Sequence, residues 1–177
     1  RDRFEIVRDV ETMGGKHNHP EVRYNDVRVP KENLLGERGG GHKLGQVRLG
    51  PARLAHCMRW LGQIEMALEM LIDRAQKRFA HGSLLSEKQS IQWMMSDSAM
   101  ELYSSKLMVL HAAYKIENGM EFKQEVSMAK HHVANTLWRV VDRAMQVHGA
   151  LCYSTDTPLA GICLLYTSDA ADDWSSV

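Results

Sequence analysis

The chain has 177 residues, a hydrophobic fraction of 44%, and 22 lysines and arginines that balance 22 aspartates and glutamates. A chain of this length can bury roughly 70% of its unfolded surface, so it needs neither disulfides nor metal to support a core. Zero net charge disfavours nucleic-acid binding by bulk electrostatics, the apolar runs are far shorter than the ~18 residues of a membrane span, and three cysteines without CxxC spacing suggest neither a disulfide framework nor a zinc site.

The N-terminal part of the chain predicts two β-strands. Residues 4–10 and 21–29 are rich in β-branched and aromatic residues, and a turn-rich stretch over 13–20 separates them. Glycines at 39–41 then form a flexible connection. Because two strands are only marginally stable alone, we interpret residues 1–40 as the end of a β domain with its linker.

Three long helical patterns follow the linker. Apolar residues recur at every third or fourth position over residues 51–79, 86–118 and 121–148. Helices of nearly thirty residues are roughly 40–45 Å long. Long helices joined by short loops favour an antiparallel, up-down bundle, so the sequence predicts a mainly α fold with a helical bundle over residues 41–160.

The ends of these helices carry recognisable signals. Pro51 suits the first turn of the first helix, where its missing N–H costs little. Ser86 and Gln89 have the spacing of a capping box at the start of the second helix. Gly119 and Gly149 are expected to end the second and third helices.

The fourth helix that would complete the bundle is predicted to be missing or aberrant. Residues 161–177 continue no earlier periodicity, so we interpret them as an anomalous tail. The chain also begins at Arg1 and enters a strand pattern at once. We therefore expect it to be a fragment of a longer protein.

Few side chains stand out as candidates for chemistry. Arg78, beside the end of the first helix, could bind a phosphate or simply pair with the helix dipole. Arg53 could meet an anion at the helix start or be a surface residue. The small residues of 146–150 permit close approach of a ligand, but a helix cap explains them equally well. His17 and His19 lack a third ligand, so we assign no metal site.

Several short phrases occur in one order between residues 21 and 160. They are YNDVRVP at 24–30, NLLGE at 33–37, RLGPAR at 48–53, HCMR at 56–59, MAK at 128–130, QVHGA at 146–150 and DTPLA at 156–160, with Arg78, Leu85 and Gln89 between them. Together they resemble the C-terminal half of the acyl-CoA dehydrogenase family. The RLGP and HCMR phrases resemble its long-chain branch, which in animals is fused to a kinase-like domain.

The resemblance implies a subunit with an N-terminal helical domain, a middle β-barrel and a C-terminal four-helix bundle. Residues 1–40 would then end the barrel, and 41–160 would form most of the bundle. Members bind FAD across the subunit interface of a homodimer or homotetramer. They oxidise an acyl-CoA to its trans-2-enoyl form, as in fatty-acid β-oxidation, and pass electrons to an electron-transferring flavoprotein. They would be cytoplasmic in bacteria and mitochondrial or peroxisomal in eukaryotes.

The resemblance also implies cofactor-binding residues around the first helix connection. Arg78 matches the arginine that reaches the FAD pyrophosphate of the neighbouring subunit. Gln89 matches a glutamine that contacts the same cofactor. His81 stands where the family usually has phenylalanine, which places it beside the flavin nucleotide.

A second set of implied contacts follows the third helix. Gln146, Gly149 and Ala150 match the flavin-contacting Gln-x-x-Gly-Gly turn, with Ala150 in place of the second glycine. Arg53 matches an arginine near the thioester end of the acyl-CoA substrate.

We therefore predict a fragment of an FAD-dependent acyl-CoA dehydrogenase. The family's catalytic glutamate follows the Pro-Leu phrase, where residues 161–177 stand instead, so we assign no catalytic residue and expect this chain alone to be inactive. One alternative is a helical oligomerisation module in which Arg78 and Gln89 make only interface contacts. Another is a flavin monooxygenase or nitroalkane oxidase, because one fold hosts several reactions.

Overall fold

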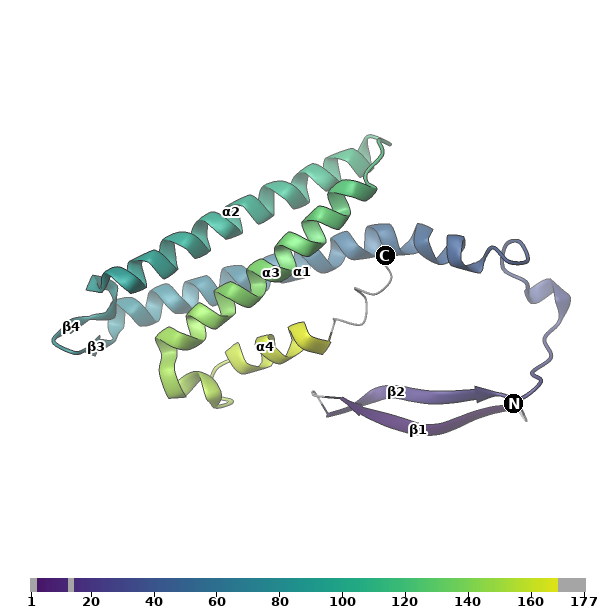
Figure 1. The fold of residues 1–177 in the computed structure, drawn as a ribbon, viewed down its shortest axis with the longest axis horizontal. Coiled ribbons are helices and arrows are strands. Elements are labelled where there is room, and N and C mark those ends of the chain that lie inside the picture. Colours follow the sequence, from purple (N-terminus) through teal and green to yellow (C-terminus); the bar gives the residue numbers. More distant parts are fainter. Residues whose placement is uncertain (1–2, 13–14, 169–177) are drawn as a thin grey trace. The chain divides into compact units, whose positions relative to one another are not determined.

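The computed structural model describes residues 3–12 and 15–168 of the chain. The chain forms two compact units, one that ends at Leu49 and one that begins at Gly50. The first unit contains a β-hairpin and the second is helical (Figure 1). The prediction of a mainly α fold preceded by strands is confirmed.

The hairpin consists of β1 (Phe4–Thr12) and β2 (Gly15–Tyr24), which pair antiparallel. Phe4 lies opposite Tyr24, and their ring centroids are 5.2 Å apart. Aromatic cross-strand pairs of this kind stabilise a two-stranded ribbon. The hairpin therefore has a defined register, although its described side chains are exposed.

The second strand was predicted over residues 21–29, and both ends were wrong. Residues 15–20 of the stretch predicted as a linker belong to β2 instead, and Pro20 lies opposite Asp9 beside a register shift. A proline without an N–H is tolerated at such an irregularity. Beyond the hairpin, Asp26 has a φ of 48°, which interrupts extended backbone. A short 3-10 helix, Lys31–Asn33, follows.

The first long helix, α1 (Gly41–Lys77), begins ten residues before the predicted start. The prediction treated Pro51 as a first-turn residue, but it lies inside the helix. A proline removes one backbone hydrogen bond, to the carbonyl of Val47 four residues earlier. The backbone of residues 41–50 is nonetheless helical, so this single loss does not interrupt the helix.

A tight hairpin that the sequence analysis did not predict connects α1 to the next helix. Strands β3 (Phe79–Ala80) and β4 (Ser83–Leu84) pair antiparallel around two turn residues. His81 has a φ of 55° and Gly82 a φ of 84°. Two successive positive φ angles are typical of the type I′ turn that suits a two-residue hairpin.

The second helix, α2 (Gln89–Glu117), follows a 3-10 turn, Leu85–Glu87. The capping box predicted at Ser86 is not formed, because the N-cap is Lys88 and it makes no side-chain cap. Ser86 lies in the 3-10 turn, where its carbonyl accepts a hydrogen bond of 2.9 Å from the Gln92 amide. The glutamine side chain thus ties the turn to the helix.

The remaining helix ends agree with the glycine signals. Gly119, with a φ of 64°, follows α2, and α3 (Lys123–His148) ends at Gly149, whose φ is 63°. A 3-10 segment, Gly149–Tyr153, leads to α4 (Leu159–Ser168). Where a missing or aberrant fourth helix was expected, the structure thus has a short one of ten residues. Within the described residues, no helix has the length and apolarity to cross a membrane.

The core of the second unit lies between its four helices. Helix α3 has buried apolar residues along its whole length, whereas Met58 of α1 is 60% exposed. Helix α4 contributes Leu159 and Ile162, which are 0% and 6% exposed. The largest fully buried side chains are Ile64, Leu71, Leu137, Leu159, Val126, Val133, Val140 and Val141.

A partly buried polar seam joins α2 to α3. Both Arg139 Nε and Arg143 donate to the Glu101 carboxylate, each at 2.9 Å. Arg143 also donates to the Ser98 hydroxyl at 3.1 Å, and Ser98 is fully buried. Charge-assisted bonds of this kind have demanding geometry, so the seam fixes the register between the two helices.

One thiol lies in the middle of the core. Cys57 of α1 is 0% exposed, and burial raises the pKa of its thiol from the ordinary 9.0 to about 11. Lys130 of α3, which is 7% exposed, opposes part of this rise by its positive charge. The thiol is therefore uncharged in the folded protein at neutral pH.

Replacement of Leu71 should test the core directly. Leu71 is 0% exposed, and Leu71→Ala is expected to lower the free energy of unfolding by about 2–5 kcal/mol because it leaves a cavity. Urea denaturation followed by far-ultraviolet circular dichroism measures this. The control is Met58→Ala on the same helix, which should change stability by less than about 0.5 kcal/mol. Equal losses from both variants would contradict the burial described.

The buried thiol predicts a pH dependence of stability above pH 9. The pKa of Cys57 is raised in the folded state. The stability that its neutral, buried thiol contributes is therefore fully present below the unfolded pKa of 9.0 and is lost as the pH rises through about 11. The free energy of unfolding should fall by about 2–3 kcal/mol across this window. The measurement is urea denaturation at several pH values, and Cys57→Ala should have a smaller slope. An identical slope in both proteins would refute the assignment.

Candidate functional site

The predicted cofactor residues lie at one end of the second unit. Because α1, α2 and α3 run antiparallel in turn, the end of α1, the start of α2 and the end of α3 lie at the same end (Figure 1). The hairpin β3–β4 carries the first set of candidates at this end. The turn after α3 carries the second set there.

Arg78 has a fixed backbone and an exposed side chain. Its N–H donates to the Arg74 carbonyl, and its carbonyl accepts from the Leu85 N–H, both at 2.9 Å. Within the described residues its guanidinium forms no ion pair. The neighbouring Arg74 has a buried Nε with no hydrogen-bond partner. Of these two arginines, Arg78 thus offers exposed guanidinium donors that no described carboxylate pairs with.

His81 and Gln89 flank the same connection. His81 is exposed in the turn, and its carbonyl accepts a hydrogen bond of 3.0 Å from Lys88 Nζ. A left-handed conformation costs a non-glycine residue about 1–2 kcal/mol, so the turn holds the histidine in a costly conformation. Gln89 is exposed as the first residue of α2.

The turn after α3 presents open backbone. Gly149 has a φ of 63° and a ψ of −143°, a conformation that side chains disfavour. A Cβ built on Gly149 would meet nothing within 4 Å, so the space beside this backbone is open. Gln146 and Ala150 are exposed on either side. Gly149 is the C-cap of α3, and the space beside its backbone is open.

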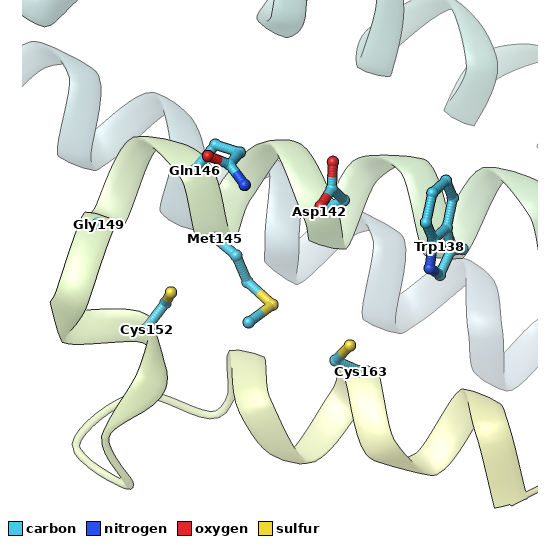
Figure 2. Close-up of a pocket in the computed structure, with 7 residues that line it drawn as sticks. All are labelled: Trp138, Asp142, Met145, Gln146, Gly149, Cys152 and Cys163. Carbon is cyan, nitrogen blue, oxygen red and sulfur yellow. The ribbon is translucent and has the colours of Figure 1, made fainter.

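A pocket of about 350 Å³ opens beside this turn, between α3, the following 3-10 segment and α4 (Figure 2). Its lining includes the predicted residues Gln146 and Gly149, together with Trp138, Asp142, Met145, Cys152 and Cys163. The sequence analysis did not identify these last five as a group. The spacing of 138, 142, 145 and 149 on one helix face was an available signal, but Cys163 joins the site only through folding.

Arg53 does not belong to this cluster. It lies on α1 some 25 residues before Arg78, which corresponds to roughly 35–40 Å of helix. The structure therefore separates the predicted substrate residue from the six predicted cofactor residues. A metal offers no alternative link, because the described residues contain no group of three or more potential ligands.

The donors at the bundle end suit a phosphorylated ligand. A guanidinium pairs with phosphate oxygens in a bidentate manner, and Arg78 offers an exposed one. The side-chain amides of Gln89 and Gln146 can both donate and accept hydrogen bonds. The open backbone at Gly149 allows a ligand to approach closely. The chemistry of these groups is therefore compatible with a phosphate-containing cofactor.

Comparisons with known sequences identify close relatives. A family described as "Acyl-CoA dehydrogenase, C-terminal domain" matches residues 39–167. The chain is 42% identical over 159 residues to "Probable acyl-CoA dehydrogenase FadE2" of Mycobacterium tuberculosis, covering 88% of this chain and 39% of that protein. It is 35% identical over 164 residues to "Acyl-CoA dehydrogenase family member 11" of Rattus norvegicus, covering 89% of this chain and 21% of that protein.

Solved structures show the same fold. Butyryl-CoA dehydrogenase from Megasphaera elsdenii has a TM-score of 0.83 at 28% identity, covering 95% of this chain and 44% of that chain. A structure titled "PigA with FAD and proline" has a TM-score of 0.86 at 19% identity, covering 94% of this chain and 44% of that chain, and supports the fold alone. The chain thus spans less than half of these proteins. With residues 39–167 matching its C-terminal domain, the chain belongs to the acyl-CoA dehydrogenase family.

Proposed function

We propose that this chain supplies the C-terminal, flavin-contacting part of an FAD-dependent acyl-CoA dehydrogenase. The observation that carries the proposal is the placement of Arg78, Gln89, Gln146 and Gly149 at one end of the bundle, although they come from separate parts of the chain. The names of the relatives, in both bacteria and eukaryotes, support an acyl-CoA oxidoreductase. The proposed reaction is oxidation of an acyl-CoA to its trans-2-enoyl form.

Each residue of the bundle end has a distinct proposed role. Arg78 binds the pyrophosphate of FAD, because its guanidinium is exposed and its backbone is fixed. Gln89 and Gln146 orient the cofactor through their amides. Gly149 leaves the backbone accessible, and Ala150 narrows the approach by one methyl group. FAD, when bound, supplies the redox centre of the reaction.

The reacting end of the substrate requires groups beyond this cluster. We propose that Arg53 contributes to binding the acyl-CoA, about 35–40 Å of helix away from the cofactor residues. No catalytic base is assigned, because residues 161–177 stand where the resemblance places the family's glutamate, and the aspartates at 169, 172 and 173 do not match its context. We therefore propose that the isolated chain is inactive.

The partners proposed for the whole protein follow from this role. An electron-transferring flavoprotein or another acceptor would reoxidise the cofactor. A homodimer or homotetramer would bring two copies together, so that Arg78 of one copy could serve the FAD of the other. The compartment would be the cytoplasm of a bacterium, or a mitochondrion or peroxisome of a eukaryote.

Flavin binding provides the direct test of the proposal. Residues 39–160 can replace the matched segment of the 42%-identical mycobacterial relative. The chimera is expected to purify with bound flavin, and Arg78→Ala should weaken FAD affinity by about 10- to 150-fold, since a bond to a charged group contributes about 1.5–3 kcal/mol. The measurement is flavin titration by fluorescence quenching.

The control for this test is Lys77→Ala. Lys77 adjoins Arg78 and pairs with Asp73 on the surface, so its loss should leave FAD affinity within about twofold of the unaltered chimera. A folded chimera without flavin, or equal effects of the two substitutions, would contradict the proposal. Circular dichroism of each variant confirms that it is folded.

His81 allows the turn and the ligand contact to be separated. His81→Gly removes the strain of the positive φ and is expected to raise the free energy of unfolding by about 0.5–1 kcal/mol. If the imidazole packs against the flavin nucleotide, the same variant of the chimera should bind FAD several-fold more weakly. Stability is measured by urea denaturation and affinity by titration. Unchanged affinity with raised stability would show that His81 serves the turn alone.

A further inference from the structure

One glycine of α1 packs tightly against the connection between α2 and α3. A Cβ built on Gly50 would lie 3.1 Å from Cε2 and 3.6 Å from Cζ of Phe122. Carbon atoms in ordinary contact are about 3.5–4.0 Å apart, so the ring leaves no room for a methyl group at position 50. The other glycines of α1, Gly41, Gly45 and Gly62, would meet nothing within 4 Å. The close approach is therefore specific to Gly50.

This contact lies where the sequence of α1 favours a helix least. Gly50 immediately precedes Pro51, and both lie inside the helix. Glycine and proline are the two least favourable residues in a helix interior, and Pro51 also lacks the N–H of the helical hydrogen-bond pattern. Packing against other parts of a protein commonly overrides such local preferences. The Phe122 ring supplies packing of this kind at Gly50.

Phe122 is itself held on both sides by hydrogen bonds. It is the N-cap of α3, and its carbonyl accepts a hydrogen bond of 3.0 Å from the Val126 N–H. Before it, the Met120 N–H donates to the Lys115 carbonyl at 2.9 Å. The Lys115 side chain pairs with Glu125 of α3, and these two side chains are only 17% and 15% exposed. The connection therefore presents the ring to α1 from a fixed backbone.

We infer that Phe122 is a positioning residue for Arg53. Arg53 follows Gly50 by three residues, and residues three apart are neighbours on a helix surface. By packing on the Gly50 backbone, the ring keeps this turn of α1 helical and fixes the point from which the Arg53 side chain extends. The inference rests on the proposed role of Arg53 in binding the acyl-CoA and adds a residue on which that role depends.

Hydrogen exchange of the 177-residue chain tests the contact without flavin or substrate. Phe122→Ala should make the amides of residues 52–56 exchange about tenfold faster, because this turn then opens more often. In that background Gly50→Ala should slow the exchange again, since there is room for the methyl group and alanine favours a helix. With the ring present, Gly50→Ala should give no such gain.

The matched control for this experiment is Gly62→Ala. Gly62 lies on the same helix, and a Cβ there would meet nothing within 4 Å. Its substitution should have the same effect with and without the Phe122 ring. If Gly50→Ala also acted equally in both backgrounds, the ring would not brace α1 and the inference would fail. Circular dichroism confirms that each variant is folded, and Phe122→Leu replaces Phe122→Ala if the latter is not.

Substrate kinetics of the flavin-loaded chimera test the positioning role. The substrate is whichever of butyryl-CoA and palmitoyl-CoA the chimera oxidises faster, with a dye as electron acceptor. Phe122→Ala should raise KM about tenfold and leave kcat within about threefold, because it weakens a bond to a charged group that is made throughout the reaction. Tyr114→Ala, which removes a 58% exposed ring near the same connection, should leave KM unchanged.

A double-mutant cycle separates positioning from a general loss of stability. Arg53→Ala alone should raise KM, and adding Phe122→Ala to it should change KM by less than about twofold, because the ring acts through the arginine. Additive effects, or a normal KM in Phe122→Ala, would overturn the inference. A chimera that binds no flavin would instead contradict the proposed function, and hydrogen exchange would still decide whether the ring braces α1.

Discussion

The charged seam between α2 and α3 determines how the ends of the helices align. Glu101 receives hydrogen bonds from Arg139 and Arg143, and Arg143 continues to the buried Ser98 hydroxyl. A slip of one helical turn would leave these partly buried charges unmatched, which is more costly than losing an apolar contact. Because α2 begins just after the hairpin with Arg78, and α3 ends at the Gln146 turn, this register also positions the proposed cofactor residues.

Most of the helical fold could be predicted from the sequence, and the exceptions have local causes. Helix α3 has nearly the predicted range because its apolar residues form one buried face. The glycines at 119 and 149 adopt the positive φ angles that are typical of helix ends. The predicted start of α1 was wrong because Pro51 lies inside a helix that begins ten residues earlier. The hairpin around His81 was missed because it occupies so few residues, and its first turn position holds histidine rather than asparagine or glycine.

The candidate site was predictable only in part, for a different reason. The resemblance of short sequence phrases singled out Arg78, Gln89 and the turn at 146–150. The antiparallel helices bring these residues to one end of the fold. The pocket could not be predicted, because Cys163 reaches it from α4 through tertiary packing.

The three cysteines of the helical unit differ in how deeply they are buried. Cys163 on the short α4 is half-buried, Cys152 is 8% exposed beside it, and Cys57 is completely enclosed between α1 and its neighbours. Local openings of a protein require less free energy than global unfolding. Detachment of α4 would therefore expose the first two thiols, whereas Cys57 becomes accessible only when the three long helices separate. The rates at which a thiol reagent modifies each cysteine would thus distinguish sub-global from global opening without any introduced label.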